Sequence, residues 1–163
     1  MCSLLNPSGT PSLDILSIRQ IGQQGALLPD GSPAQPLESG LGETTLELLV
    51  SGDIKRQISQ AEANQFLIQR PKLAEHACRQ KGVGRFGEKI VGCSLPHLLE
   101  HVSIDLLVER CACQIAGNTS IGVSGPDKSE KAARIMLRAS GASLDEMVRA
   151  VQDARLLVLR ILA

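Results

Sequence analysis

The chain has 163 residues and a mass of 17.3 kDa, which fits one domain with one hydrophobic core. Hydrophobic residues make up 43% of it, but the aromatic ones are only Phe66 and Phe86, so the core must be aliphatic and stacking platforms for single-stranded nucleic acid are missing. The formal net charge is zero and the pI is near 6.8, which leaves no basic field for a phosphate backbone and excludes nucleic acid as an expected partner.

The N-terminal part predicts a tail followed by two strands. Residues 1–11 are typical of a flexible tail, and residues 12–163 are expected to form a single domain. Partial alternation of apolar and polar residues predicts strands at 13–18 and 43–50. The segment 29–42 between them is rich in Pro, Gly and Ser, which indicates a surface loop across which the two strands pair.

The middle of the chain predicts helices. A Ser-x-x-Glu capping box at Ser59 begins the first helix, and Pro71 divides it into two short helices or kinks it. The glycine-rich stretch 81–87 indicates a loop. A second helix is expected from the N-cap Ser94 to about Cys113.

The C-terminal part predicts two more strands, at 119–123 and 133–139, and a final helix from Ser143 to Leu162. The resulting order is ββααββα. This order favours an α+β fold in which the helices pack on one face of a mainly antiparallel sheet. The final helix has more apolar residues than one face needs, so it is a candidate surface for a homo-oligomer.

The first residues of the chain and its cysteines indicate the cellular compartment of the protein. The first ten residues carry no charge and do not resemble a signal peptide, and no apolar run reaches the roughly 18 residues of a membrane span. We therefore expect a cytoplasmic protein without membrane association and with free thiols. The cysteines are odd in number and form no C-x-x-C pair: Cys2, Cys78, Cys93, Cys111 and Cys113.

The second predicted helix contains the pattern H-x-x-E-H, formed by His97, Glu100 and His101. Histidines four residues apart lie on one face of a helix and can bind one metal ion. In the inverted zinc motif of this spacing, the glutamate handles the proton of the attacking water. The pattern predicts zinc on the two histidines and catalysis by Glu100. The competing interpretation is an ordinary amphipathic helix with a polar patch.

The third metal ligand is left open by the sequence. His76 and its neighbour Glu75 precede the glycine-rich loop, which could bring either residue back to the second helix. Asp105 continues the helical row of the two histidines and is the other candidate. Cys78 and Cys93 flank the region and could bind metal, but they are not among the expected ligands.

Residues 73–107 resemble the N-terminal domain of cyanophycin synthetase. That family has a Glu-His pair at the end of one helix, a glycine-rich loop with Phe, and a His-x-x-Glu-His helix followed by Val and a carboxylate. The chain departs from the family at Asp105, usually a glutamate, and at Ser120, usually an arginine. The matching residues are Glu75-His76, Gly84, Phe86, Gly92, His97 to Val102 and Asp105.

The resemblance implies a function for the chain. The family's full-length enzymes polymerise aspartate and arginine with an ATP-grasp and a ligase domain, which this chain lacks, so we expect a stand-alone module. By the resemblance, His97 and His101 would be metal ligands, Glu100 the general base, and Glu75 or His76 the third ligand. The expected activity is zinc-dependent hydrolysis of amide or peptide bonds in a peptide or polypeptide-like substrate, including cyanophycin-like or isopeptide-linked ones. The alternative is a non-catalytic module of the same fold that binds or assembles a polymer.

Overall fold

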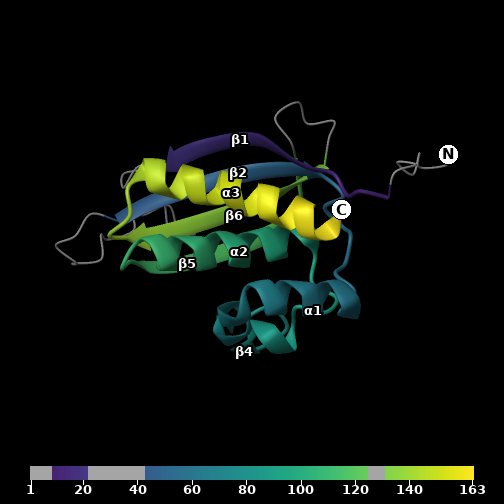
Figure 1. Ribbon diagram of the computed structural model, residues 1–163. Coiled ribbons are helices and arrows are strands. Elements are labelled where there is room, and N and C mark those ends of the chain that lie inside the picture. The colour runs from purple at the N-terminus through teal and green to yellow at the C-terminus, as the bar shows by residue number, and fades with distance from the viewer. Residues whose placement is uncertain (1–8, 22–42, 125–130) are drawn as a thin grey trace.

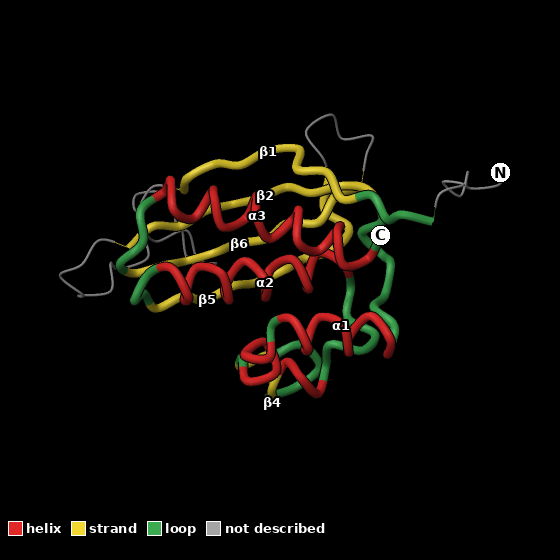
Figure 2. Tube along the Cα trace, in the orientation of Figure 1, coloured by secondary structure: helices red, strands yellow, loops and turns green. Residues whose placement is uncertain are grey.

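A four-stranded antiparallel sheet with helices on one face organises the protein (Figures 1 and 2). The computed structural model describes residues 9–21, 43–124 and 131–163. The strand order is β1-β2-β6-β5, and α2 (Leu95–Arg110) and α3 (Leu144–Leu162) cover one face of the sheet. The expected α+β class is confirmed. The strands are β1 (Leu13–Ile21), β2 (Glu43–Gly52), β5 (Gln114–Ser124) and β6 (Lys131–Ser140).

The strand pairs follow the alternation of the sequence. β1 pairs with β2 as expected, and β6 lies between β2 and β5. β5 is longer than the predicted strand at 119–123, because Gly117, which looked like a break, pairs with Leu137 inside the ladder. Residues 1–8 of the predicted tail and the predicted loop at 29–42 lie outside the described residues.

A small lobe separates the second strand from α2. It contains α1 (Gln60–Gln69), the short helices η1 (Pro71–Glu75) and η2 (Phe86–Glu88), and a hairpin of β3 (Ala77–Cys78) and β4 (Gly84–Arg85). η1 contacts α2, and the lobe lies beside α2 instead of on the sheet (Figure 1). The expectation that all helices cover the sheet is therefore wrong for α1, and the predicted loop at 81–87 contains one strand of the hairpin.

The helix ends follow their capping residues. Ser59 and Ser143 each form the predicted capping box, and the Ser94 hydroxyl accepts the backbone N–H of His97. α2 ends at Arg110, earlier than the predicted end near Cys113, because the chain turns extended at Cys111 before it enters β5.

The core is aliphatic and continuous. Its residues come from the helix-facing side of the sheet, from the buried rows of α2 and α3, and from the lobe. Both phenylalanines are fully buried in the lobe part of the core. No helix in the described part of the chain is long and apolar enough to cross a membrane. The fully buried members on the sheet and the two long helices include Leu46, Leu48, Val50, Ile135, Leu137, Leu98, Leu99, Val102, Met147 and Val151.

Candidate metal centre

The first half of α2 carries buried polar side chains. His97, Glu100 and His101 are 7%, 4% and 3% exposed, because β5 lies on one side of the helix and the lobe on the other. A buried polar group without a partner costs free energy, so each of these side chains needs a hydrogen bond, an ion pair or a metal.

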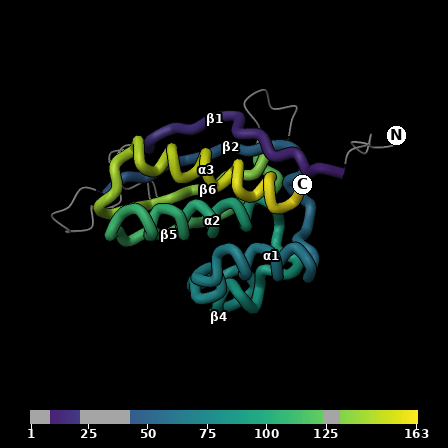
Figure 3. The backbone as a smooth tube through the Cα atoms, in the orientation of Figure 1, coloured from purple at the N-terminus to yellow at the C-terminus, as the bar shows by residue number. Residues whose placement is uncertain are grey.

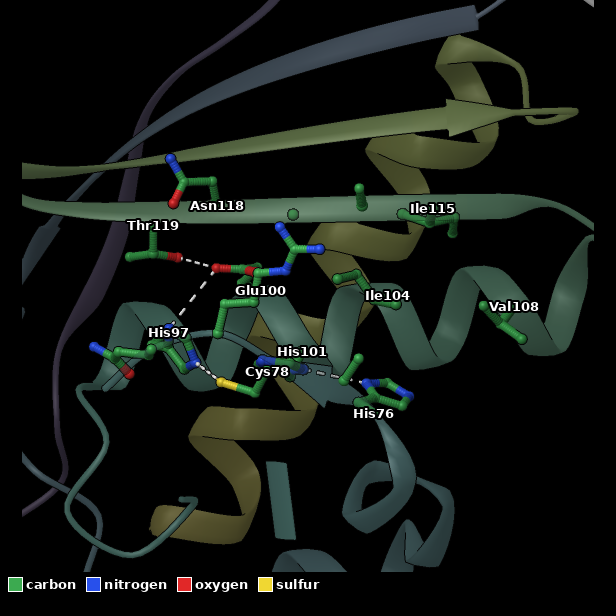
Figure 4. A pocket seen from close by; sticks show the side chains of 15 residues that line it. His76, Cys78, His97, Glu100, His101, Ile104, Val108, Ile115, Asn118 and Thr119 are labelled. Atoms are coloured by element: carbon green, nitrogen blue, oxygen red, sulfur yellow. Dashed lines mark hydrogen bonds and ion pairs between the residues drawn. The ribbon is translucent and has the colours of Figure 1, made fainter. Parts of the chain in front are cut away.

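The two histidines converge with Cys78, which comes from β3 in the lobe (Figure 4). One ligand atom from each of the three residues lies within 4.8 Å of the other two, and Cys78 Sγ is 3.4 Å from His97 Nε2. A tetrahedral zinc ion with bonds of about 2.3 Å to sulfur and 2.05 Å to nitrogen holds these two atoms roughly 3.5 Å apart. The three residues therefore form a buried group that fits a metal ion by ligand type and by spacing.

The lobe fixes Cys78 through its backbone. Lys89 Nζ, at the end of η2, donates a hydrogen bond to the Cys78 carbonyl in β3 at 2.8 Å and another to the Gly82 carbonyl in the turn of the hairpin. The turn between the strands has positive φ at Lys81 (57°) and Gly82 (102°). This tight hairpin returns the chain, so that Cys78 faces α2.

Burial keeps both histidines in the form that binds a metal. Desolvation, with a contribution from the charge of Lys89, lowers the pKa of His97 to about 4. Desolvation and the neighbouring His97 and His76 lower the pKa of His101 to about 3. Both rings are neutral at pH 7, and a neutral imidazole has a nitrogen lone pair for a metal.

A chain of polar groups extends from His101 to the outside of the lobe. His76 Nδ1 is 3.2 Å from His101 Nδ1, and His76 Nε2 is 3.4 Å from Asp105 Oδ1. Arg70 pairs with Asp105 at 2.5 Å. Burial raises the pKa of Asp105, but hydrogen bonds from His76 and Arg70 outweigh it and hold the pKa below its usual value. An ionised Asp105 accepts a hydrogen bond from His76 Nε2–H, which makes His76 Nδ1 an acceptor for His101 Nδ1–H and leaves His101 Nε2 free to bind a metal.

The residues that the sequence offers as third ligand, Glu75, His76 and Asp105, lie outside the group of Cys78, His97 and His101. Among the described residues, the converging group contains neither Glu75, which is exposed, nor His76 and Asp105, which lie behind His101. Cys93 is buried and lies outside the group, and burial raises the pKa of its thiol to about 12. Cys78 was missed as an expected ligand because no local motif joins it to the helix, whose first histidine lies 19 residues further on.

Glu100 lies between α2 and β5. Its Oε2 accepts a hydrogen bond from the Thr119 hydroxyl and is 3.9 Å from His97 Nδ1, too far for a hydrogen bond. Gly117 makes this approach possible: a Cβ at that position would be 2.5 Å from Glu100 Oε1. Burial raises the pKa of Glu100 to about 7, against the opposing effect of the Thr119 bond. Near neutral pH this carboxyl can both accept and release a proton.

Phe86 forms the floor of the site. Its ring stacks on that of His101 with centroids 3.8 Å apart and planes inclined by 15°, and it lies 5.7 Å from the ring of His97. Its backbone N–H donates to the His76 carbonyl at 2.7 Å. The fully buried ring fixes the plane of His101 and keeps water from that side of the cluster.

The cluster opens into a cavity of about 820 Å³ between α2, β5 and the lobe. A volume of this size admits a small molecule or a few residues of a peptide. Comparison of the chain with family models, with curated proteins and with solved structures found no match. The polar side chains that line the cavity are His76, Cys78, Arg79, Gln80, His97, Glu100, His101, Asn118 and Thr119.

Proposed function

We propose that this protein is a zinc-dependent hydrolase of amide or peptide bonds. The observation that carries the proposal is the buried group of Cys78, His97 and His101 beside a buried carboxyl, Glu100, in a cavity. Three protein ligands from cysteine and histidine suit zinc and leave one coordination position for water, as in catalytic zinc sites. Zinc there would act as a Lewis acid and lower the pKa of a bound water towards ~7.

The chain's own residues supply the proton transfers in this proposal. Glu100 accepts a proton from the water that attacks the carbonyl carbon, and it passes that proton to the amine nitrogen as the C–N bond breaks. The Thr119 hydroxyl holds Glu100 from β5, and Gly117 leaves room for its carboxylate. His76, Asp105 and Arg70 orient His101 from behind. The resemblance of residues 73–107 to the N-terminal domain of cyanophycin synthetase supports the same class of reaction, although it implies Glu75 or His76 in the place that we give to Cys78.

The test compares metal content and turnover. We expect the purified protein to hold one zinc per chain and to cleave members of a library of internally quenched peptides. Glu100→Gln keeps the shape of the side chain and should retain the zinc while losing turnover by at least about 100-fold. Glu43→Gln, on β2, is the matched control and should cleave as the parent does. A zinc-loaded Glu100→Gln protein with full activity would contradict the mechanism.

One observation favours the non-catalytic alternative. The polar groups of the site also bond to one another: His76 to His101, and Thr119 to Glu100. In the described part of the chain, the buried side-chain nitrogens and oxygens without a hydrogen bond are limited to Arg56 Nη1. A polymer-binding or assembly module could therefore keep this site without a metal. Such a module would contain no zinc after purification. It would bind its polymer equally well with and without a chelator in solution.

A further inference from the structure

The cavity has two chemically different ends. The lining residues that directly follow β3 in the chain, Arg79 and Gln80, are polar. On the other side of Glu100 the lining includes Ile104 and Val108 on α2 and Ile115 on β5, and His76 lies on this side too. Figure 4 shows these three side chains on one side of Glu100, with Ile115 on the strand above Ile104. The site therefore continues into an apolar pocket on one side.

This apolar end is open. Val108 is 51% exposed and Ile104 is half-buried, although both lie on a helix whose other apolar residues are almost all buried. Asp105 and Glu109, the carboxylates next to Ile104 and Val108 in the sequence, are both paired with Arg70 and do not line the cavity. Among the described residues, the charged side chains that line the cavity are Glu100 and Arg79, and the three apolar side chains at this end offer no polar atom. A charged group placed there would lose water without gaining a partner.

We propose that Ile104, Val108 and Ile115 form a subsite for an aliphatic side chain of the substrate, next to the bond that is cut. This inference rests on the proposed function and adds the substrate class, a peptide with a residue such as leucine beside the scissile amide. Ile104 and Val108 follow Glu100 at four-residue steps on one face of α2, so a substrate held beside Glu100 can extend along this face to the subsite. It disfavours the arginine and aspartate side chains of a cyanophycin-like polymer at this position.

The test measures binding rather than turnover. Amino-acid hydroxamates chelate zinc through one end and present a chosen side chain, so the zinc-loaded protein is titrated calorimetrically with those of leucine, glycine, aspartate and arginine. Burial of a leucine side chain should make leucine hydroxamate bind at least about tenfold more tightly than the glycine compound. The aspartate and arginine compounds should bind no better than the glycine compound.

Two variants test whether the preference for leucine hydroxamate comes from this subsite. Val108→Asp should abolish the preference for leucine, and Ile104→Ala should reduce it by about threefold while changing the fold less. Val91→Asp is the matched control, because Val91 is a valine of similar exposure, 46%, outside the cavity. It should keep the full preference.

The outcomes separate the two proposals. Hydroxamates that bind the zinc-loaded protein equally well overturn the subsite and leave the hydrolase proposal standing. A leucine preference that survives in both Val108→Asp and Ile104→Ala overturns the subsite as well. Failure of every hydroxamate to bind the zinc-loaded protein overturns the proposed function itself, because the metal would then have no open position.

Discussion

The two long helices on the sheet, α2 and α3, lie side by side (Figure 3) but differ in the residues that they bury. α3 is amphipathic: its buried residues are apolar and lie along one side, and its charged residues are exposed except for the half-buried Arg155. α2 is buried on most of its surface and includes His97, Glu100, His101 and Asp105 among its buried residues. Packing explains the sequence of α3, but it would not select four ionisable groups inside α2. The difference separates a helix that serves the fold from one that serves a site.

The two helices also differ in how their buried groups affect the stability of the folded state. Buried ionisable groups destabilise the folded state unless partners compensate them. A ligand that binds only the folded state adds stability according to its concentration and affinity. Zinc should therefore stabilise α2 and its contacts with the lobe, and substitutions on the two helices should affect different measurements.

The largest expected effect is the loss of zinc in Cys78→Ala. Removal of one of three protein ligands should lower the zinc affinity by more than about 100-fold, the upper range for outer-shell substitutions. Competition with a chromophoric chelator measures the affinity. Cys113→Ala and Glu75→Gln are controls outside the converging group and should bind zinc as the parent does. Unchanged affinity in Cys78→Ala would remove Cys78 from the site.

A substitution in α3 should lower the stability of the fold and leave the zinc affinity unchanged. Met147 is fully buried, and Met147→Ala should lower the free energy of unfolding by about 3 kcal/mol through lost burial and a cavity. The zinc affinity of the folded protein should stay the same. Urea unfolding and the chelator competition measure the two quantities. A large loss of zinc affinity in this variant would show that the two helices are not separable in function.

The groups behind His101 should have an intermediate effect. His76→Ala and Asp105→Asn each remove one link of the chain that orients His101, and each should lower zinc affinity by about tenfold. The chelator competition used for Cys78→Ala gives the comparison. A loss in His76→Ala as large as that in Cys78→Ala would mean that His76 binds the metal directly.

A further expected effect is the pH dependence of the stability of the metal-free protein. Between pH 4.5 and 6.5 the unfolded chain protonates His97 and His101, whose folded pKa values are about 4 and 3, against ordinary values of 6.5. In the same range folded Glu100, with a pKa of about 7, retains a proton that the unfolded chain loses above its ordinary pKa of 4.5. The unfolded state thus binds about one proton more, so stability should rise with pH by about 1.4 kcal/mol per unit.

Urea unfolding at several pH values in a chelator checks this slope. Glu100→Gln removes the opposing proton and should roughly double the slope, to about 2.8 kcal/mol per unit. A stability that falls with rising pH in the parent protein would contradict the neutral state of the two buried histidines.

Local signals made most of the fold predictable. The serine caps, the alternation in β2 and β6 and the pairing of β1 with β2 each depend on residues close together or on a regular pattern. The short hairpin was not predictable in this way, because β3 and β4 have two residues each and form through a tight turn and contacts to Lys89. The start of β5 was not predicted, because Gly117 lies inside the strand and glycine is usually a sign that a strand ends.

The site was predictable only where the helix itself supplies it. The spacing of His97, Glu100 and His101 specifies a shared region of α2, and the structure buries all three there. Cys78 depends on how the lobe folds back on α2, which no spacing reveals. Asp105 follows the histidines along the helix, but its carboxylate is held by Arg70 from the junction of α1 and η1, a contact between residues 35 positions apart.

Gly117 has a consequence for reading other sequences. Even a methyl group at position 117 would overlap the carboxylate of Glu100. The residue at this position of β5 therefore determines whether the carboxylate can lie where it does here. A chain with the same helix motif, a glycine in the following strand and a hydroxyl residue two positions later, as Thr119 is here, can be interpreted as keeping the buried acid. A larger residue at the glycine would force the carboxylate away from the position that it has here.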